Sequence, residues 1–464
     1  MVAILPAGPL HLFLCALILL TGCSTYQHRI APVREFAAQG EMERALDHVA
    51  KMMKPGDLLY HLETGMLLHL MERYEESDAQ FDLAELLIED LYTKSLSRKG
   101  FSYLLNEEVE AYDGEPFERF LINYYRALNH LHMGHLTGAL VEARKIDLKW
   151  ALQADSKGNL IEQGRLPFVE YFAALLHEEG GELNDALVSL RLAEEAYSRL
   201  EDRVSAPEPP WLAADLDRVA LKGGFTDFIE KIPRDQDQEG IEEGQGEIVL
   251  LLENGWIPIR GETRISIPLL ESESDIDDDG VILLAGRLHH RYETHRMHGA
   301  WFPERVKITY WLEVALPFFP PLRPLVVQTA RLSSGSLHAE TIRVEDLGVA
   351  AQISFEAQEG EIIMRAIVRA LLKYIGHRLA EKSGGAVAGF LANFVGVATE
   401  TADTRAWSTL PREFQMARLF LPEGSHPLTL DCLGSRGEII ESVDLGTVEV
   451  EAGRRIFINW RAHY

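Results

Sequence analysis

The sequence predicts a multi-domain α + β protein, with α-helical repeats in its N-terminal half and a mostly β domain in its C-terminal half. Apolar residues recur at helical spacing between residues 30 and 200. Beyond residue 246, β-branched and aromatic runs are bounded by Gly, Pro and Asn, as is typical of strands. A chain of 464 residues is also too long for one ordinary core.

Composition excludes several classes of protein and of partner. Hydrophobic residues make up 47% and charged residues 25%, which is globular composition and argues against a disordered, collagen-like or multi-span membrane protein. The net charge of −27 repels a polyanionic duplex, so we expect no nucleic-acid partner. The three cysteines, Cys15, Cys23 and Cys432, are too few for a disulfide framework and match no zinc pattern.

Residues 1–22 have the pattern of a secretory signal peptide. An apolar run ends in small residues before Cys23, contains no acidic residue, and is shorter than the stretch of about 20 apolar residues that spans a membrane. The tetrapeptide at 20–23, Leu-Thr-Gly-Cys, resembles the lipobox of bacterial lipoproteins. That resemblance implies cleavage between Gly22 and Cys23 and a fatty acyl group, such as palmitate, on the Cys23 thiol. The alternative is an ordinary cleaved signal with a chance cysteine.

Ser24 follows the predicted lipidation site instead of Asp. In the lipobox resemblance this implies sorting to the outer membrane, with the protein facing the periplasm. Residues 23–29 would then be a tether between the acyl group and the folded protein.

Helical repeats are predicted over residues 30–200. A turn residue followed five positions later by a small residue occurs at Gly40/Ala45, Glu72/Ser77, Gly134/Ala139 and Gly181/Ala186. Small residues let the two helices of a repeat cross closely. Around the second pair the pattern resembles the tetratricopeptide repeat, although the spacings of 32, 62 and 47 residues between turns depart from about 34 and indicate insertions. Generic helical hairpins are the alternative, and either form makes concave surfaces that hold peptides or partner helices.

Residues 201–246 are predicted to be a Pro-rich and acidic linker with one short helix. Residues 247–464 form the predicted β-rich domain, with strands expected at 247–253, 263–269, 281–288, 307–316, 325–332, 414–421, 426–432 and 454–462. A helical insert at 359–403 interrupts it, with one helix at 359–382 and another at 386–401 after a Ser-Gly-Gly break.

Two clusters in this domain resemble metal-binding patterns, but each has a simpler interpretation. Asp275, Asp277 and Asp279 match the start of a calcium loop, but the position of its closing bidentate Glu is a glycine, so we expect a solvated loop. The second cluster comprises His289, His290, His295 and His298. Neighbouring arginines oppose a divalent metal there, so we expect a polar loop.

Three basic residues form a stripe along the helix predicted at 359–382. Arg365, Arg369 and Lys373 would suit an anionic membrane surface, but the apolar remainder of their helix favours packing inside the domain. The sequence contains no nucleophile elbow, Walker loop, zinc-protease motif or dinucleotide fingerprint. We therefore expect no enzyme activity and no cofactor.

The tract from Glu400 to Pro411, ETADTRAWSTLP, with ARLFLPEG downstream, resembles the signature of an uncharacterised family of bacterial tetratricopeptide-containing outer-membrane lipoproteins. Two further pieces agree with it: residues 102–106 with Tyr112, Gly114, Phe117 and Glu118, and residues 253–255 with Pro258 and Arg260. The resemblance implies a structural role for Asp403, Arg405, Trp407 and Pro411. It implies no biochemical activity, although members are often encoded beside small lipoproteins related to peptidoglycan-synthase activators and secretion-channel components.

Together these observations predict a lipid-anchored periplasmic scaffold that acts in cell-envelope or surface-structure assembly. Its helical repeats would bind envelope proteins or other lipoproteins, and its acyl group on Cys23 would hold it at the membrane. One alternative is a secretion-channel accessory lipoprotein. The other is an envelope-remodelling enzyme or a periplasmic ligand-binding protein.

Overall fold

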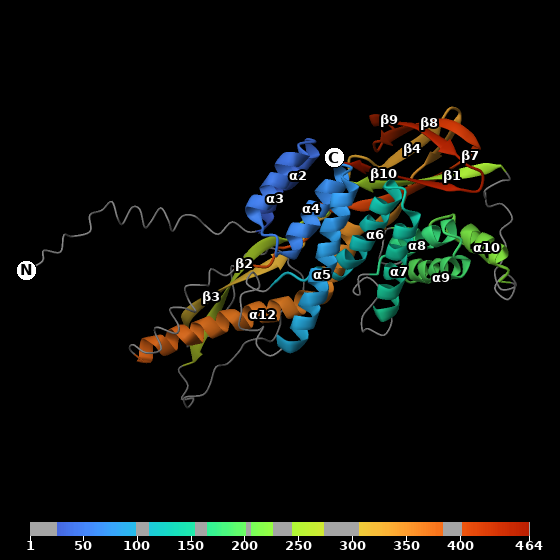
Figure 1. Ribbon diagram of the computed structural model, residues 1–464. Helices are drawn as coiled ribbons and strands as arrows, with labels where there is room; N and C mark the ends of the chain where they lie inside the picture. The colour runs from blue at the N-terminus through green and yellow to red at the C-terminus, as the bar shows by residue number, and fades with distance from the viewer. Residues whose placement is uncertain are drawn as a thin grey trace, which may run out of the picture.

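The computed structural model describes residues 26–98, 111–153, 165–200, 206–225, 244–272, 306–383 and 401–463. Within them, helices come first and sheets follow, which confirms the coarse fold class predicted from the sequence (Figure 1). Several predictions fall outside the described residues. They are lipidation at Cys23, the strand at 281–288, the helix at 386–401, the aspartates Asp275, Asp277 and Asp279, and the histidines His289, His290, His295 and His298.

Before the first strand, the helices of the described residues form four hairpins and one further helix. The hairpins are α2 (Tyr26–Ala38) with α3 (Met42–Met52), α4 (Leu58–Leu70) with α5 (Tyr74–Arg98), α6 (Pro116–His132) with α7 (Leu136–Gln153), and α8 (Pro167–Glu179) with α9 (Leu183–Leu200). Helix α10 (Leu212–Gly223) follows, inside the predicted linker. Helix α2 begins at Tyr26, so residues 26–29 of the predicted tether are helical.

The turn residues identified in the sequence are the points where these hairpins reverse. Each has a left-handed backbone, with φ of 75° at Gly40, 60° at Glu72, 72° at Gly134 and 77° at Gly181. Glycine adopts this conformation without steric cost, whereas Glu72 does not. The small residue five positions later is fully buried at Ala45, Ser77, Ala139 and Ala186.

Helices α4 and α5 show why small residues are needed where they cross. A Cβ atom added to Gly65 would lie 2.7 Å from the ring of Phe81, which is itself fully buried. The Ser77 hydroxyl also donates a hydrogen bond to the Gly65 carbonyl at 2.7 Å. The second hairpin is therefore packed too tightly to admit a methyl group at residue 65.

Two four-stranded sheets follow the helices. The first has the order β10 (Arg455–Ala462), β1 (Gln245–Asn254), β7 (Glu413–Pro422), β6 (Ile342–Asp346), and only its β10–β1 pair is parallel. The second is antiparallel, with the order β5 (Leu337–Glu340), β4 (Thr329–Ser334), β8 (Gly424–Leu433), β9 (Ile439–Val450). The sequence did not predict β5, β6 or β9.

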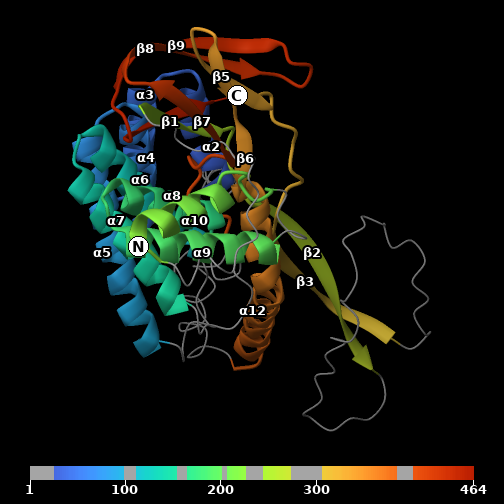
Figure 2. The same cartoon turned by 90° about the vertical axis from the view of Figure 1, so that its right-hand side faces the viewer.

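Helices, first sheet and second sheet form three layers (Figure 2). Strand β1 lies in the middle layer and is buried on both faces. Its Val249 and Leu251 side chains join the core formed with the helices, whereas Ile248, Leu250 and Leu252 join the core between the two sheets. The helical and sheet regions thus share one hydrophobic core, which extends across the predicted linker.

A ribbon and a long helix project from these layers (Figures 1 and 2). Strands β2 (Gly261–Ser272) and β3 (Val306–Phe318) pair in antiparallel fashion, and α12 (Leu347–Ser383) packs against them through Ala366 and Ala370. Helix α12 begins at Leu347, earlier than the predicted residue 359, because Leu347 and its neighbours belong to the main core. Among the described residues, no helix is both long and apolar enough to span a membrane.

We predict that Gly65→Ala destabilises the protein because its methyl group would meet the Phe81 ring. The overpacking should exceed the gain in helix propensity and leave a net loss of about 1–2 kcal/mol in the free energy of unfolding, measured by chemical denaturation. The matched control is Gly56→Ala, whose added methyl group meets nothing within 4 Å. Equal stabilities of the two variants would contradict the tight crossing of α4 and α5.

Candidate functional site

The segment 401–411, which leads into β7, passes between the helices and the first sheet. It has no helix or strand of its own, yet most of its residues are buried. The residues singled out by the family resemblance, Asp403, Arg405, Trp407 and Pro411, all lie in it. We call residues 401–411 the inner segment.

Trp407 is fully buried and fixes the middle of the inner segment. Its ring centroid lies 5.5 Å from that of Phe81 on α5 and 5.8 Å from that of Tyr125 on α6. Its backbone N–H donates a hydrogen bond to Glu118 Oε1 at 2.8 Å, and its indole N–H donates to Thr409 Oγ1 at 3.2 Å. Aromatic packing and polar contacts therefore hold the same residue from several sides.

Glu63, on α4, binds the residues that follow Trp407. Its carboxylate accepts hydrogen bonds from the Ser408 N–H at 2.6 Å and from the Thr409 N–H and hydroxyl at 3.2 and 2.6 Å. The Tyr26 hydroxyl donates to the Ala406 carbonyl at 2.8 Å and lies 3.2 Å from Glu63 Oε1. Burial raises the pKa of Glu63, and these donors counteract that effect.

Asp403 and Arg405 pair with each other at 2.7 Å. Asp403 Oδ1 also accepts the Arg405 backbone N–H at 3.0 Å, and the Arg405 guanidinium lies 5.5 Å from the ring centroid of Tyr112. Tyr112 in turn donates to Glu118 Oε2 at 2.7 Å. Two stretches that lie far apart in the sequence thus meet around the inner segment.

Buried ion pairs also join the first sheet to the helices. Arg418 on β7 binds Asp215 of α10 at 2.7 Å and also pairs with Glu247 on β1. Arg455 on β10 reaches Glu247 at 2.7 Å and Glu178 of α8 at 2.8 Å. Burial alone would raise the pKa of Asp215, but the neighbouring guanidinium groups outweigh it and lower that pKa.

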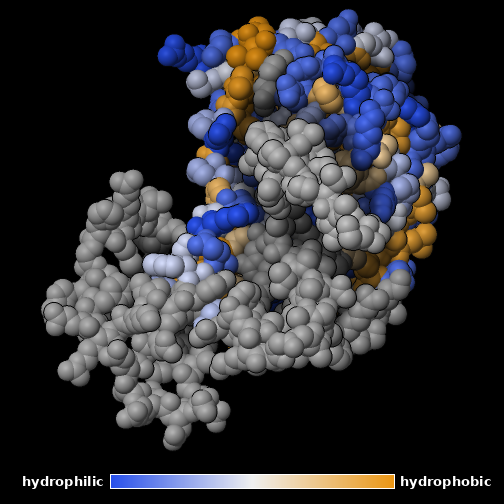
Figure 3. All heavy atoms as spheres, turned by 90° about the vertical axis from the view of Figure 1, so that its left-hand side faces the viewer, coloured by the Kyte–Doolittle hydropathy of each residue, from blue (hydrophilic) through white to orange (hydrophobic). Residues whose placement is uncertain are grey.

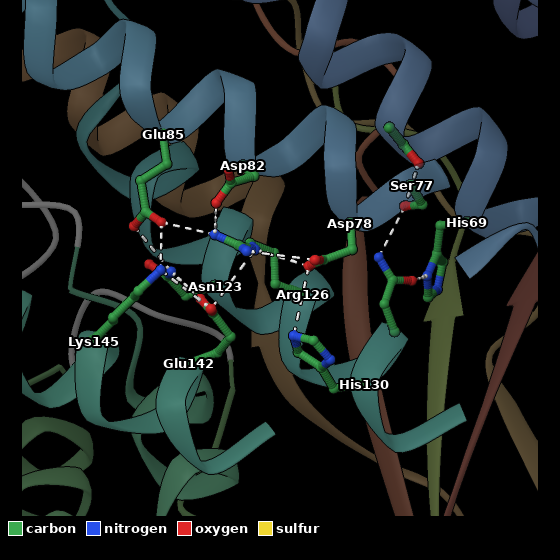
Figure 4. Close-up of polar contacts among 12 residues, drawn as sticks. His69, Ser77, Asp78, Asp82, Glu85, Asn123, Arg126, His130, Glu142 and Lys145 are labelled. Atoms are coloured by element: carbon green, nitrogen blue, oxygen red, sulfur yellow. Dashed lines mark hydrogen bonds and ion pairs between the residues drawn. The ribbon is translucent and has the colours of Figure 1, made fainter. Parts of the chain in front are cut away.

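A second ionic cluster links α5, α6 and α7 (Figure 4). Arg126 on α6 binds Asp78, Asp82 and Glu85 on α5 at 2.9, 2.9 and 3.0 Å. Lys145 on α7 binds Glu85 at 2.7 Å, which places α5 and α7 side by side. Burial opposes ionisation of Glu85, but Lys149 and Lys145 outweigh it and lower its pKa to about 2.

Helices α5 and α7 expose large apolar side chains around this cluster. We call this surface the outer face; it comprises Leu83, Leu86, Val141, Leu148 and Leu152. Leu86 is 56% exposed and Leu148 is 59% exposed. By contrast, α6 and α8 are buried along nearly their whole length. The inner segment and the sheet contact the inner helices, whereas these apolar side chains of α5 and α7 are exposed to solvent.

The described residues also contain a recess of about 340 Å³ that is lined by residues 323–328, which precede β4, and by residues of β6 and the start of β7. Three guanidinium groups line it, from Arg323, Arg343 and Arg412. Asp346 already binds Arg412 at 3.1 Å, and Glu413 lies 3.5 Å from Arg343. The acids thus compensate part of the positive charge of this recess.

Much of the surface outside the outer face and the recess is hydrophilic. On the face shown in Figure 3, blue residues predominate over the upper part of the molecule, and orange residues occur as separate groups between them. Apolar side chains scattered singly are normal on a protein surface, so they identify no site there.

Comparisons with known proteins identify no family. No family model matches the chain, and no curated protein matches it. Two crystal structures of nearly identical TPR-like repeats from a putative kinesin light chain of Podosopora anserina, one of them carrying a single substitution, align at 13% identity and a TM-score of 0.27. The alignments cover 44% of this chain and 90% and 91% of those chains. Such a likeness is too weak to support any conclusion about this protein.

We predict that Glu118 makes stability depend on pH. Burial is the largest cause, followed by the charge of Glu115, and together they raise the pKa of Glu118 from 4.5 to about 7. A raised carboxyl pKa means that the folded state binds the proton more tightly than the unfolded state does. This contribution to stability is therefore full below pH 4.5 and is lost as the pH rises towards 7.

The measurement is the free energy of unfolding of the wild type and of Glu118→Gln between pH 5 and pH 8. Over that range the wild type should lose about 2–3 kcal/mol more than the variant, which has no titrating group at residue 118. Parallel curves for the two proteins would show that Glu118 titrates normally.

Proposed function

We propose that this protein is a lipid-anchored scaffold of the bacterial cell envelope that binds another envelope protein through the outer face. The observation that carries the proposal is that the two helices of a hairpin have different surroundings. The inner helices are committed to the chain's own sheet and inner segment, whereas α5 and α7 expose leucines and a valine. A scaffold needs a rigid body with one such free surface.

The composition of the outer face suits a protein partner. Cores of protein interfaces are rich in apolar side chains and are ringed by polar groups. On the outer face, Leu86 and Leu148 lie next in sequence to Glu85 and Lys149, which bind each other at 3.1 Å. A partner could bury the leucines while these ion pairs hold α5 and α7 in place.

An acyl group on Cys23 would hold the start of α2 close to the membrane. Tyr26 is only three residues from Cys23 and is already buried against the inner segment. Three residues span at most about 11 Å, so the tether would be short. Partners anchored in the same membrane, such as other lipoproteins, would then meet the outer face at high local concentration.

The outer face is tested by the double variant Leu86→Asp and Leu148→Asp. Both side chains are exposed, so the fold should survive, but charge in the apolar patch should reduce recovery of a cross-linked envelope partner at least tenfold. The matched control is Leu221→Asp on α10, where the leucine is 60% exposed and lies outside the outer face.

Recovery is measured by cross-linking in intact cells, purification of the full-length protein and quantitative mass spectrometry. The identity of the recovered protein separates a general scaffold from a secretion-channel accessory. Unchanged recovery from the double variant, with the control also unchanged, would exclude the outer face as the binding surface.

Lipid anchoring is tested by intact-mass analysis and membrane fractionation of the full-length protein beside Cys23→Ala. We expect the wild type to carry the mass of the acyl groups on Cys23 and to sediment with the outer membrane, because several acyl chains anchor a protein stably. The variant should lack that mass. An unmodified, freely soluble wild-type protein would contradict the anchoring proposal.

A further inference from the structure

Three metal-ligating side chains converge at the turn between α8 and α9. They are His177, Glu182 and Asp185, and one ligand atom from each lies within 4.8 Å of the others. The His177 side chain is fully buried, Glu182 is partly exposed and Asp185 is exposed, so the cluster opens to solvent on one side. The left-handed turn at Gly181, with φ of 77°, brings the start of α9 back onto the end of α8.

The far side of the imidazole is held by a carboxylate. His177 Nε2 lies 2.8 Å from Asp147 Oδ2 on α7, and Asp147 Oδ1 accepts a hydrogen bond from the Ser189 hydroxyl at 2.9 Å. His177 Nδ1 points the other way and lies 2.9 Å from Glu182 Oε2. A metal-binding histidine typically donates its second N–H to a carboxylate, which fixes the ring and its tautomer. Asp147 is placed to do this while Nδ1 faces the two acids.

Equivalent positions in the other hairpins show that two acids here are unusual. Counted from the buried small residue after each turn, the matching positions hold Glu41 and Arg44 in the first hairpin, Arg73 and Glu76 in the second, and His135 and Gly138 in the third. The first two sets are ion pairs of opposite charge. The fourth hairpin instead has two acids, Glu182 and Asp185, of which Glu182 pairs with Arg144 of α7. A cation bound between the two acids would relieve their mutual repulsion.

The neighbouring Glu170 adds little negative charge to the cluster, because its raised pKa keeps its carboxyl group protonated. Glu170 is fully buried, and neither of its carboxylate oxygens has a hydrogen-bond partner. Burial is the main cause, and the charge of Asp147 the next, of a pKa raised well above the ordinary value for Glu170. The cations near the cluster are His177 itself, Arg144, which pairs with Glu182 from a half-exposed position, and Arg165, which acts on Glu170.

We propose that His177 Nδ1 and the carboxylates of Glu182 and Asp185 form a binding site for a divalent transition-metal ion of the Zn²⁺ type. One imidazole and two carboxylates are a ligand set that Zn²⁺ accepts, with a fourth position left for water. Asp147 and Ser189 orient the imidazole, and the ion joins the end of α8 to the start of α9. This inference does not depend on the lipid anchor or on the outer face.

Binding must release a proton. Without metal, both ring nitrogens of His177 face carboxylates, which favours the imidazolium form. Burial lowers the pKa of His177, but the hydrogen bonds and charges of Asp147 and Glu182 outweigh burial and raise that pKa. A metal at Nδ1 replaces the proton there, while Nε2 keeps its proton towards Asp147. The balance is one metal ion taken up for one proton given off.

The test is a calorimetric titration of the full-length protein with Zn²⁺ alone. We expect one ion per chain, with affinity that falls about tenfold per pH unit below the pKa of His177, because one proton is displaced. Titrations in two buffers of different ionisation enthalpy should show about one proton released per ion.

Variants locate the site. Asp185→Asn removes an exposed ligand without disturbing the core and should weaken Zn²⁺ binding by at least tenfold, whereas His177→Gln should abolish it. Glu76→Gln is the matched control, because Glu76 is the equivalent acid in the second hairpin, where Arg73 replaces Glu182. Equal binding by the wild type, Asp185→Asn and the control would mean adventitious binding to an acidic chain and would overturn the proposal. So would a wild-type protein that binds no Zn²⁺ at any pH between 6 and 8.

Discussion

The arrangement of the whole molecule depends on two carboxylates that receive the backbone N–H groups of the inner segment. An irregular segment can be buried only if its polar backbone groups find partners, because each unsatisfied N–H costs about 1–3 kcal/mol. Glu63 binds the N–H groups of Ser408 and Thr409, and Glu118 binds that of Trp407. These contacts hold the inner segment on α4 and α6, and the chain then continues directly into β7 of the central sheet. Helices and sheet therefore form one body.

Buried charged side chains, like buried backbone groups, need partners inside this protein. Buried charges are tolerated when they are paired, and removing one partner of such a pair is strongly destabilising. Arg418, Arg455 and their acids join α8 and α10 to three strands of the first sheet. Apolar packing alone would tolerate small shifts between the layers, whereas ion pairs between fixed atoms do not. The outer face is consequently presented by a rigid body.

Much of the helical region was predictable because its signals are local. A turn residue and a small residue five positions later depend only on the geometry of one hairpin, and all four pairs mark hairpins in the structure. The longer apolar runs likewise became β1, β7, β8 and β10. Strand β9 was missed because it lies at a sheet edge and most of its side chains are at least partly exposed, which leaves little apolar signal.

The contacts of the inner segment and the proposed metal site were less predictable, because the residues that form them come from separate elements. Glu63 lies 346 positions from Thr409, and its only local signal is a charged residue within the apolar run of α4. His177, Glu182 and Asp185 match no motif because they belong to two helices and a turn. Glu118 lies 289 positions before Trp407, and no local pattern links Tyr112 and Glu118 to Arg405 and Trp407. In the structure these four residues form a single set of contacts around the inner segment. Because these residues contact one another to bury the inner segment, the side chain at each position limits which side chains fit at the others.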